Sequence, residues 1–211
     1  MAVADKSPGA PRRGRPATGV REAILSATES ILADAGVARL STKEVARRAG
    51  VAESSIYYHF GDRLGLLLAV VQTHLPPVKQ VLEELYRTAG TGELRDDLIA
   101  LLDALERFFR RALPIAAAIE SDGELRKAFA ERSSRLDVGP HRAIEGVRGY
   151  LAEQRGSGRL PRSLDLDATA LLLVGAAHQR ALQRRGSAAA ADLASSAQLV
   201  DVLLPTLSAT P

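Results

Sequence analysis

Apolar residues recur at steps of three and four along most of this chain, and this spacing constrains its fold more than any other feature. Near the N-terminus the pattern runs through Val20, Ile24, Ala27, Ile31 and Ala35. Residues at that spacing share one face of an α-helix, which can then pack against a core. No stretch of useful length alternates apolar and polar residues as a half-buried strand does. We therefore predict an all-α fold.

Composition agrees with a folded globular protein and excludes several classes of site. The 211 residues, 46% apolar and 25% charged, suffice for one large domain or two small ones. The absence of Cys excludes disulfides and thiolate sites and fits a cytoplasmic protein. No apolar run approaches the roughly 18 residues of a membrane helix, and the basic N-terminus lacks the apolar stretch of a secretory signal. We expect a cytoplasmic protein that does not associate with membranes.

Capping residues mark two short helices after the first one. Gly36 stands where a left-handed C-cap would end the first helix. Ser41 and Glu44 have the S-x-x-E spacing of a capping box, which starts a short helix ending at Gly50. A third segment runs from about 52 to 60. A long helix followed by two short ones around a turn is the helix-turn-helix arrangement, whose last helix lies in the DNA major groove.

The third segment contains an unusual cluster of aromatic residues. Tyr57, Tyr58 and Phe60 lie close together in a chain that has four Phe, four Tyr and no Trp. Neighbouring helical residues point in different directions, so the three rings cannot all face one core. Phe60 can share the buried face with Ile56, which leaves the tyrosines outside to meet phosphates and thymine methyls. The alternative is that the rings pack in a core or form a small protein contact surface.

Prolines suggest where the first domain ends. Asp62 can cap a fourth helix, and Pro76 and Pro77 would end it. We therefore expect a helix-turn-helix domain over residues 18–75 and a larger helical domain over residues 76–211.

Similar signals divide the second half into helices. Pro114 would end or kink a long helix, and a last helix would reach Pro205. Ser121 with Glu124 repeats the capping-box spacing and predicts another helix start.

A pattern of residues runs through the two short helices, T-x-x-(I/V)-A-x-x-A-G-V followed by (L/I)-Y-x-(H/Y)-F. It is matched by Thr42, Val45, Ala46, Ala49, Gly50, Val51, Ile56, Tyr57, His59, Phe60 and Leu66. With this pattern, residues 18 to 70 resemble the DNA-binding signature of the TetR family. The resemblance implies a homodimeric, ligand-responsive transcriptional regulator, usually a repressor, that binds a palindromic operator on double-stranded DNA. Effector binding in the C-terminal domain would move the two DNA-reading domains apart. An activator of the same fold is the alternative.

The resemblance also assigns DNA contacts residue by residue. It implies phosphate contacts by Thr42 and Lys43, base-edge contacts by Ser54 and Ser55, mixed contacts by Tyr57, Tyr58 and His59, and a phosphate contact by Arg63.

Three residues depart from the family's pattern. Ala52 replaces the usual Ser-type cap, and Gly61 stands where Lys is frequent. Glu53 either accepts from a cytosine amine or complements the helix N-terminus outside the groove, and we favour the second reading. These departures keep open a third function, that of a ligand-binding or adaptor protein without operator binding.

A basic arm precedes the signature at residues 1–17. Its "RGRP" stretch matches the core of peptides that lie along a narrow minor groove, which predicts minor-groove contacts by Arg13 and Arg15. A solvated tail is the alternative.

The resemblance further implies dimerisation through the last two helices, at about residues 165–185 and 190–207. The alternative is that their faces pack only within one subunit. Small residues there would permit close approach, and leucines would supply apolar area. The residues concerned are Ala170, Gly175, Ala176 and Ala177, with Leu171, Leu173, Leu199 and Leu203.

The sequence carries few signals for a small-molecule pocket. We predict a mainly apolar effector that contacts Phe109, Ile119 and Leu172, with His178 as a polar group. Each of these residues has an alternative place in the core or on the surface. The four His residues are scattered and no catalytic or phosphate-loop motif occurs, so we expect no enzyme activity, no metal site and no cofactor.

Overall fold

The computed structural model describes residues 17–34, 40–88, 91–136, 141–186 and 193–208, and every regular element in these ranges is helical. The all-α prediction is confirmed. Arg13, Arg15 and Gly36 lie outside the described residues. The helices are α1 (Ala17–Asp34), α2 (Thr42–Ala49), α3 (Glu53–Phe60), α4 (Arg63–Thr73), α5 (Leu75–Arg87), α6 (Leu94–Glu120), α7 (Gly123–Leu136), α8 (His141–Gly156), α9 (Leu166–Gly186) and α10 (Ser196–Ser208).

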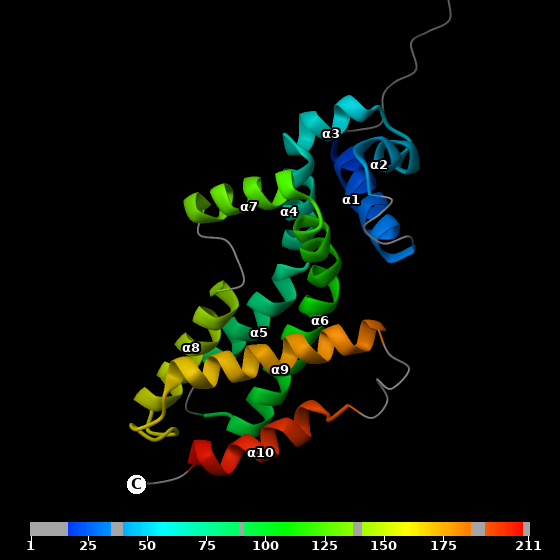
Figure 1. The fold of residues 1–211 in the computed structure, drawn as a ribbon. Coiled ribbons are helices and arrows are strands. Elements are labelled where there is room, and N and C mark those ends of the chain that lie inside the picture. The colour runs from blue at the N-terminus through cyan, green and yellow to red at the C-terminus, as the bar shows by residue number, and fades with distance from the viewer. Residues whose placement is uncertain (1–16, 35–39, 89–90, 137–140, 187–192, 209–211) are drawn as a thin grey trace, which may run out of the picture.

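The helices surround two apolar cores. One core gathers α1, α2, α3 and α4 around fully buried side chains such as Ile24, Val45 and Ile56. The other gathers α5, α6, α8, α9 and α10 around residues such as Leu101 and Tyr150. Figure 1 shows α3 at one end of the molecule and α9 and α10 toward the other. The predicted DNA-reading helix and the predicted dimerisation helices are therefore well separated.

Helix α6 connects the two cores. Its first half supplies Leu101 to the second core, whereas Ile115, Ala118 and Ile119 near its end are buried in the first core. The helix-turn-helix domain thus completes its core with residues far beyond the boundary that we expect near residue 76.

Two prolines lie inside helices, namely Pro114, which the sequence predicts to end or kink a helix, and Pro205, which it predicts as the end of the last helix. Helix α6 continues through Pro114 to Glu120, and α10 continues through Pro205 to Ser208. Proline removes one backbone hydrogen bond and crowds the preceding turn. Buried side chains beyond each proline, Ile115 in α6 and Leu207 in α10, hold the continuing turns against the cores.

The helix starts follow the predicted caps in two of three places. Ser41 Oγ accepts from the Glu44 backbone N–H at 3.2 Å, and Asp62 Oδ1 accepts from the Gly65 N–H at 2.6 Å. The prediction for α7 is wrong by one residue. Asp122, not Ser121, caps this helix, because its carboxylate accepts from the backbone N–H groups of residues 124 and 125.

The prolines after α4 begin a helix instead of ending one. Helix α4 ends at Thr73, and Pro76 and Pro77 lie in the first turn of α5. Proline suits that turn because its first backbone N–H groups have no partner within the helix. Among the described helices, none is long and apolar enough to cross a membrane.

Candidate nucleic-acid interface

A sharp turn at Gly50 sets the direction of α3 relative to α2. Gly50 has φ 69° and ψ 35°, a left-handed conformation that other residues adopt with strain. The Val51 N–H donates to the Ala46 carbonyl at 3.0 Å, which closes the end of α2. Ile56, completely buried, then fixes the inner face of α3 on the core.

The outer face of α3 carries the two tyrosines. Tyr57 is 50% exposed and Tyr58 84% exposed, whereas Phe60 is partly buried against the core. Their outward orientation agrees with the prediction from helical geometry. The Tyr58 ring meets the His59 ring edge-on, with 5.0 Å between the centroids. This arrangement presents hydroxyl, imidazole and ring surfaces together on one exposed helix.

The serines at the start of α3 are accessible to a ligand. Ser54 is exposed and Ser55 half-buried, and both have short side chains that let a helix approach base edges closely. The Arg21 guanidinium of α1 lies 5.4 Å from the Phe60 ring centroid and supports α3 from behind.

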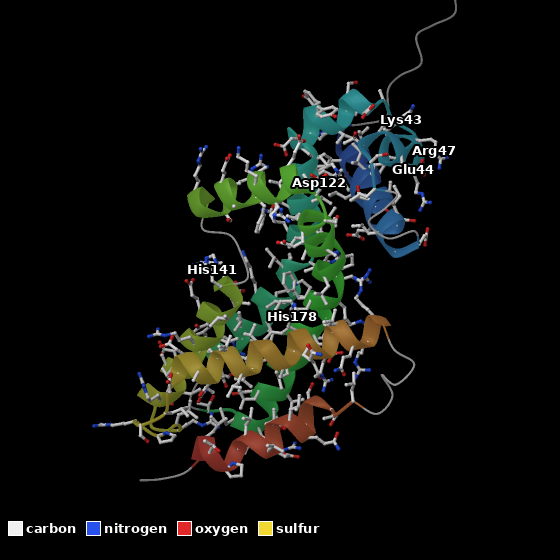
Figure 2. The ribbon with its side chains drawn as sticks, in the orientation of Figure 1. Lys43, Glu44, Arg47, Asp122, His141 and His178 are labelled. Atoms are coloured by element: carbon white, nitrogen blue, oxygen red, sulfur yellow. The ribbon has the colours of Figure 1, made fainter. Side chains whose placement is uncertain are left out.

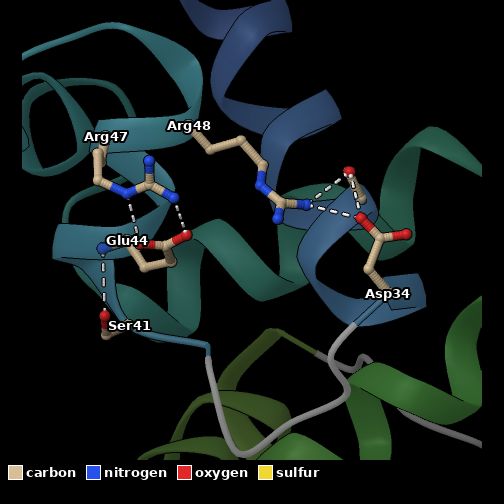
Figure 3. A network of polar contacts seen from close by, with 6 residues as sticks. Asp34, Ser41, Glu44, Arg47 and Arg48 are labelled. Atoms are coloured by element: carbon tan, nitrogen blue, oxygen red, sulfur yellow. Dashed lines mark hydrogen bonds and ion pairs between the residues drawn. The ribbon is translucent and has the colours of Figure 1, made fainter.

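Two of the three basic residues of helix α2 form ion pairs with acidic residues of the protein, as Figure 3 shows. Arg47 donates twice to the Glu44 carboxylate, at 2.8 and 2.6 Å. Arg48 donates to Asp34 at the end of α1, at 2.9 Å. Lys43 is exposed, and Figure 2 places it on the same end of the molecule as α3. Lys43 is therefore the basic group of α2 that is available for a phosphate.

Thr42 and Glu53 contact each other in this structure. The Thr42 hydroxyl donates to the Glu53 carboxylate at 2.5 Å, which joins the starts of α2 and α3. Ala52 at the N-cap of α3 has no side-chain hydrogen bond to give, as the sequence predicted. Glu53 complements the N-terminus of α3 by its charge and position in the first turn. The predicted phosphate contact of Thr42 requires its hydroxyl to leave this carboxylate.

Arg63 forms its hydrogen bonds with other residues of the protein. Its guanidinium donates to the Asp122 carboxylate at 2.8 Å and to the Leu40 carbonyl at 3.0 Å. Hydrogen bonds from backbone N–H groups at the start of α7, together with Arg63, hold the pKa of the Asp122 carboxyl below its usual value. In this conformation Arg63 joins the helix-turn-helix domain to the α6–α7 turn, which differs from the predicted phosphate contact.

A second ion pair connects the same two regions. Arg132 of α7 donates to the Asp62 carboxylate at 2.5 and 3.3 Å. The hydrogen bond from Arg132 is the largest cause that lowers the pKa of the Asp62 carboxyl. Sequence reasoning missed Arg132 and Asp122 as partners because 70 and 59 positions separate them from their counterparts, and no local pattern joins residues so far apart.

The four residues predicted to contact an effector do not line one cavity. Phe109 is nearly buried, and its ring meets the exposed His178 edge-on with 5.2 Å between centroids. Ile119 belongs to the core of the helix-turn-helix domain, and Leu172 is 61% exposed on α9. Phe109 and His178 thus remain together, and the other two lie apart. The described residues contain no group of three or more His, Cys, Asp or Glu suited to a metal ion.

The predicted dimerisation residues also divide between inside and outside. Ala170, Leu173 and Ala177 are completely buried within the subunit, so they are not available to a partner. The large apolar side chains exposed on the described parts of these two helices are Leu171, Leu172 and Leu182 on α9 and Val202 on α10.

Comparison with known proteins agrees with this geometry. A family model described as bacterial regulatory proteins, tetR family, matches residues 24–70, from α1 to α4. The transcriptional activator FasR of Mycolicibacterium smegmatis is 33% identical over 103 residues, 48% of this chain and 45% of FasR. The tetracycline repressor protein class C of Escherichia coli is 31% identical over 93 residues, 44% of this chain and 39% of the repressor. The chain thus spans less than half the length of these two relatives.

A solved structure extends the likeness to most of the chain. Salmonella enterica GusR superposes with a TM-score of 0.65 over 94% of this chain and 99% of that one, at 19% identity. At this identity the match shows a common fold.

Proposed function

Because the chain belongs to the TetR family of bacterial transcriptional regulators, we propose that it is a homodimeric repressor that binds a palindromic operator through α3 and acts in the cytoplasm. The observation that carries the proposal is the helix-turn-helix unit, in which the turn at Gly50 leads into α3, Tyr57 and Tyr58 are exposed on α3, and Lys43 is exposed on α2. Base-edge contacts would come from Ser54 and the tyrosines, and phosphate contacts from residues at the helix ends.

Dimerisation is part of the proposal because one such unit reads only one half-site. Two half-sites lie about 34 to 36 Å apart in the DNA, and their readers must be held at that spacing. Leu171, Gly175 and Leu182 are exposed at helical spacing on α9, and Val202 is exposed on α10. A stripe of this kind supports a helix-to-helix contact with a second copy of the chain.

The effector is proposed to be a small, mainly apolar molecule that releases the protein from DNA. The apolar composition of the core around α5, α6, α8 and α9 supports this class, and His178 beside Phe109 offers a polar group at its surface. Two ion pairs, between Arg63 and Asp122 and between Asp62 and Arg132, offer a route from the C-terminal helices to α4.

Repression is the proposed sign of regulation, and activation is the second candidate. The relative called a repressor supports the first, and the relative called an activator supports the second. Binding to DNA is common to both.

The test is binding to DNA fragments from upstream of the protein's own gene, over a series of salt concentrations. We expect Lys43→Gln to weaken binding several-fold. The slope of log affinity against log salt should also fall by about one for each phosphate that the variant no longer neutralises. Lys79→Gln, an equal change of charge at an exposed site on α5, is the matched control and should leave both quantities unchanged.

Equal effects of the two substitutions would contradict the assignment of α2 and α3 to DNA. Absence of any preference among fragments, with wild type and variants alike, would favour the ligand-binding or adaptor function.

A further inference from the structure

A cleft of about 610 Å³ lies between the helix-turn-helix domain and the C-terminal helices, and its charge is unbalanced. Its lining includes Arg107, Arg110 and Arg111 from α6 and Arg184 and Arg185 from α9. This volume lies in the range of small-molecule sites. The cleft includes neither residue of the Phe109–His178 contact, so it is distinct from the region predicted for an apolar effector.

The acidic groups near the cleft leave this positive charge uncompensated. The one acidic residue among its described lining residues, Glu29, lies 2.9 Å from His74 Nε2 and also accepts from the Thr73 hydroxyl. Glu106, a buried residue of α6 outside the lining, accepts from two arginines, Arg180 at 2.6 Å and Arg184 at 2.5 Å. Glu106 thus fixes Arg184 at the edge of the cleft without neutralising the other arginines.

The three arginines of α6 stand where they repel one another. Arg107 lies one helical turn before Arg110 and Arg111, at the spacings of three and four that bring side chains together. All three are exposed, and within the described part of the chain none has an ion-pair or hydrogen-bond partner. Like charges at these spacings destabilise a helix unless an anion lies between them.

Apolar residues in the lining of the cleft strengthen its positive electrostatic field. Leu32, Val70 and Ile115 are nearly or completely buried apolar residues that contribute to the lining. A cleft with one sign of charge and walls of low dielectric constant concentrates counter-ions. Guanidinium groups match phosphate and carboxylate oxygens because they donate two parallel hydrogen bonds.

We propose that this cleft binds a small polyanion, a molecule that carries two or more phosphate or carboxylate groups. Several groups are required because the arginines extend over more than one turn of α6 and across to the end of α9. The ligand contacts α1 and α4 on one side and α6 and α9 on the other, so it bridges the two cores. Binding does not depend on the proposed function, whereas an effect on operator affinity rests on it.

The experiment is calorimetric titration of the full chain, without DNA, with tripolyphosphate and separately with citrate at constant ionic strength. One saturable site per chain is expected for at least one of the two anions. Arg107→Gln with Arg111→Gln should weaken it about tenfold or more, because the anion then forms two fewer charge-assisted hydrogen bonds. Lys127→Gln with Arg162→Gln removes equal charge at exposed positions outside the cleft and should leave the affinity unchanged.

The anion that binds identifies the chemistry of the ligand, as phosphate or carboxylate. The proposal is overturned if neither anion saturates, or if both double variants weaken binding equally. Loss of operator binding in the cleft variant without any binding of small anions would also overturn it, since DNA would then be the partner of these arginines.

Discussion

Asp62 has two functions at the start of α4, and both depend on its negative charge. One carboxylate oxygen caps the helix by accepting from the Gly65 N–H, and the other accepts from Arg132 of α7. Gly65 is required at this point because a Cβ there would lie 2.0 Å from the Phe60 carbonyl oxygen. The same few residues therefore join α3 to α4 and the helix-turn-helix domain to α7.

The ion pair gives this junction a specific dependence on pH. Arg132 lowers the pKa of Asp62 in the folded protein, so the stabilisation is present above the unfolded value near 3.9 and is lost as pH falls through the folded value. We expect Arg132→Gln to lower the free energy of unfolding by about 0.5 kcal/mol at pH 6, because the pair is partly exposed and screened by solvent, and by much less at pH 2.5.

Denaturant unfolding at both pH values measures this difference. Lys127→Gln, at an exposed position of the same helix α7, serves as the control and should show little effect at either pH. An Arg132→Gln effect of equal size at both pH values would mean that the side chain stabilises by packing alone.

At the scale of the helices, the exposed face of α9 is the surface that we propose for contact with a second subunit. Leu171, Gly175 and Leu182 repeat at steps of four and seven, and His178 lies between them on the same side. Leu173 and Ala177, on the other side, are buried in the subunit. The sequence alone did not separate these two faces, because both sides of α9 are apolar.

We expect Leu182→Asp to weaken the dimer at least about tenfold, because a carboxylate would be buried in an apolar interface. The change should leave the monomer folded, since Leu182 is 47% exposed. Sedimentation equilibrium over a concentration series measures the effect, with Gln183→Asp on the neighbouring exposed position as control. A dimer of unchanged strength in the leucine variant would place the subunit contact on another surface.

Local signals account for what the sequence predicts well in these helices. The caps at Ser41 and Asp62 and the turn at Gly50 each depend on atoms within a few residues, so their spacing is visible in the chain. The continuation of α6 through Pro114 depends on burial of Ile115, which only the assembled cores provide. The partner of Arg63 is likewise fixed by tertiary packing.

On the scale of the whole molecule, α6 links the regions that we propose for DNA binding and for effector binding. Its first half packs against α9, α5 and α10, and its last turns belong to the core beneath α3. Figure 1 shows this helix running from the region of α9 toward the helix-turn-helix end. A ligand that moved α6 would therefore move residues of both cores, which would give the proposed effector binding a direct mechanical route to α3.

We propose that two copies of α3, held by one dimer, read two half-sites of an operator. Hydroxyl-radical footprinting of the protein on its operator measures this arrangement. We expect two protected segments whose centres are about 10 to 10.5 base pairs apart, or a multiple of that spacing. Both should disappear together in Tyr58→Ala. Protection of a single segment, or a footprint that Tyr58→Ala leaves intact, would show that α3 does not read two half-sites in this way.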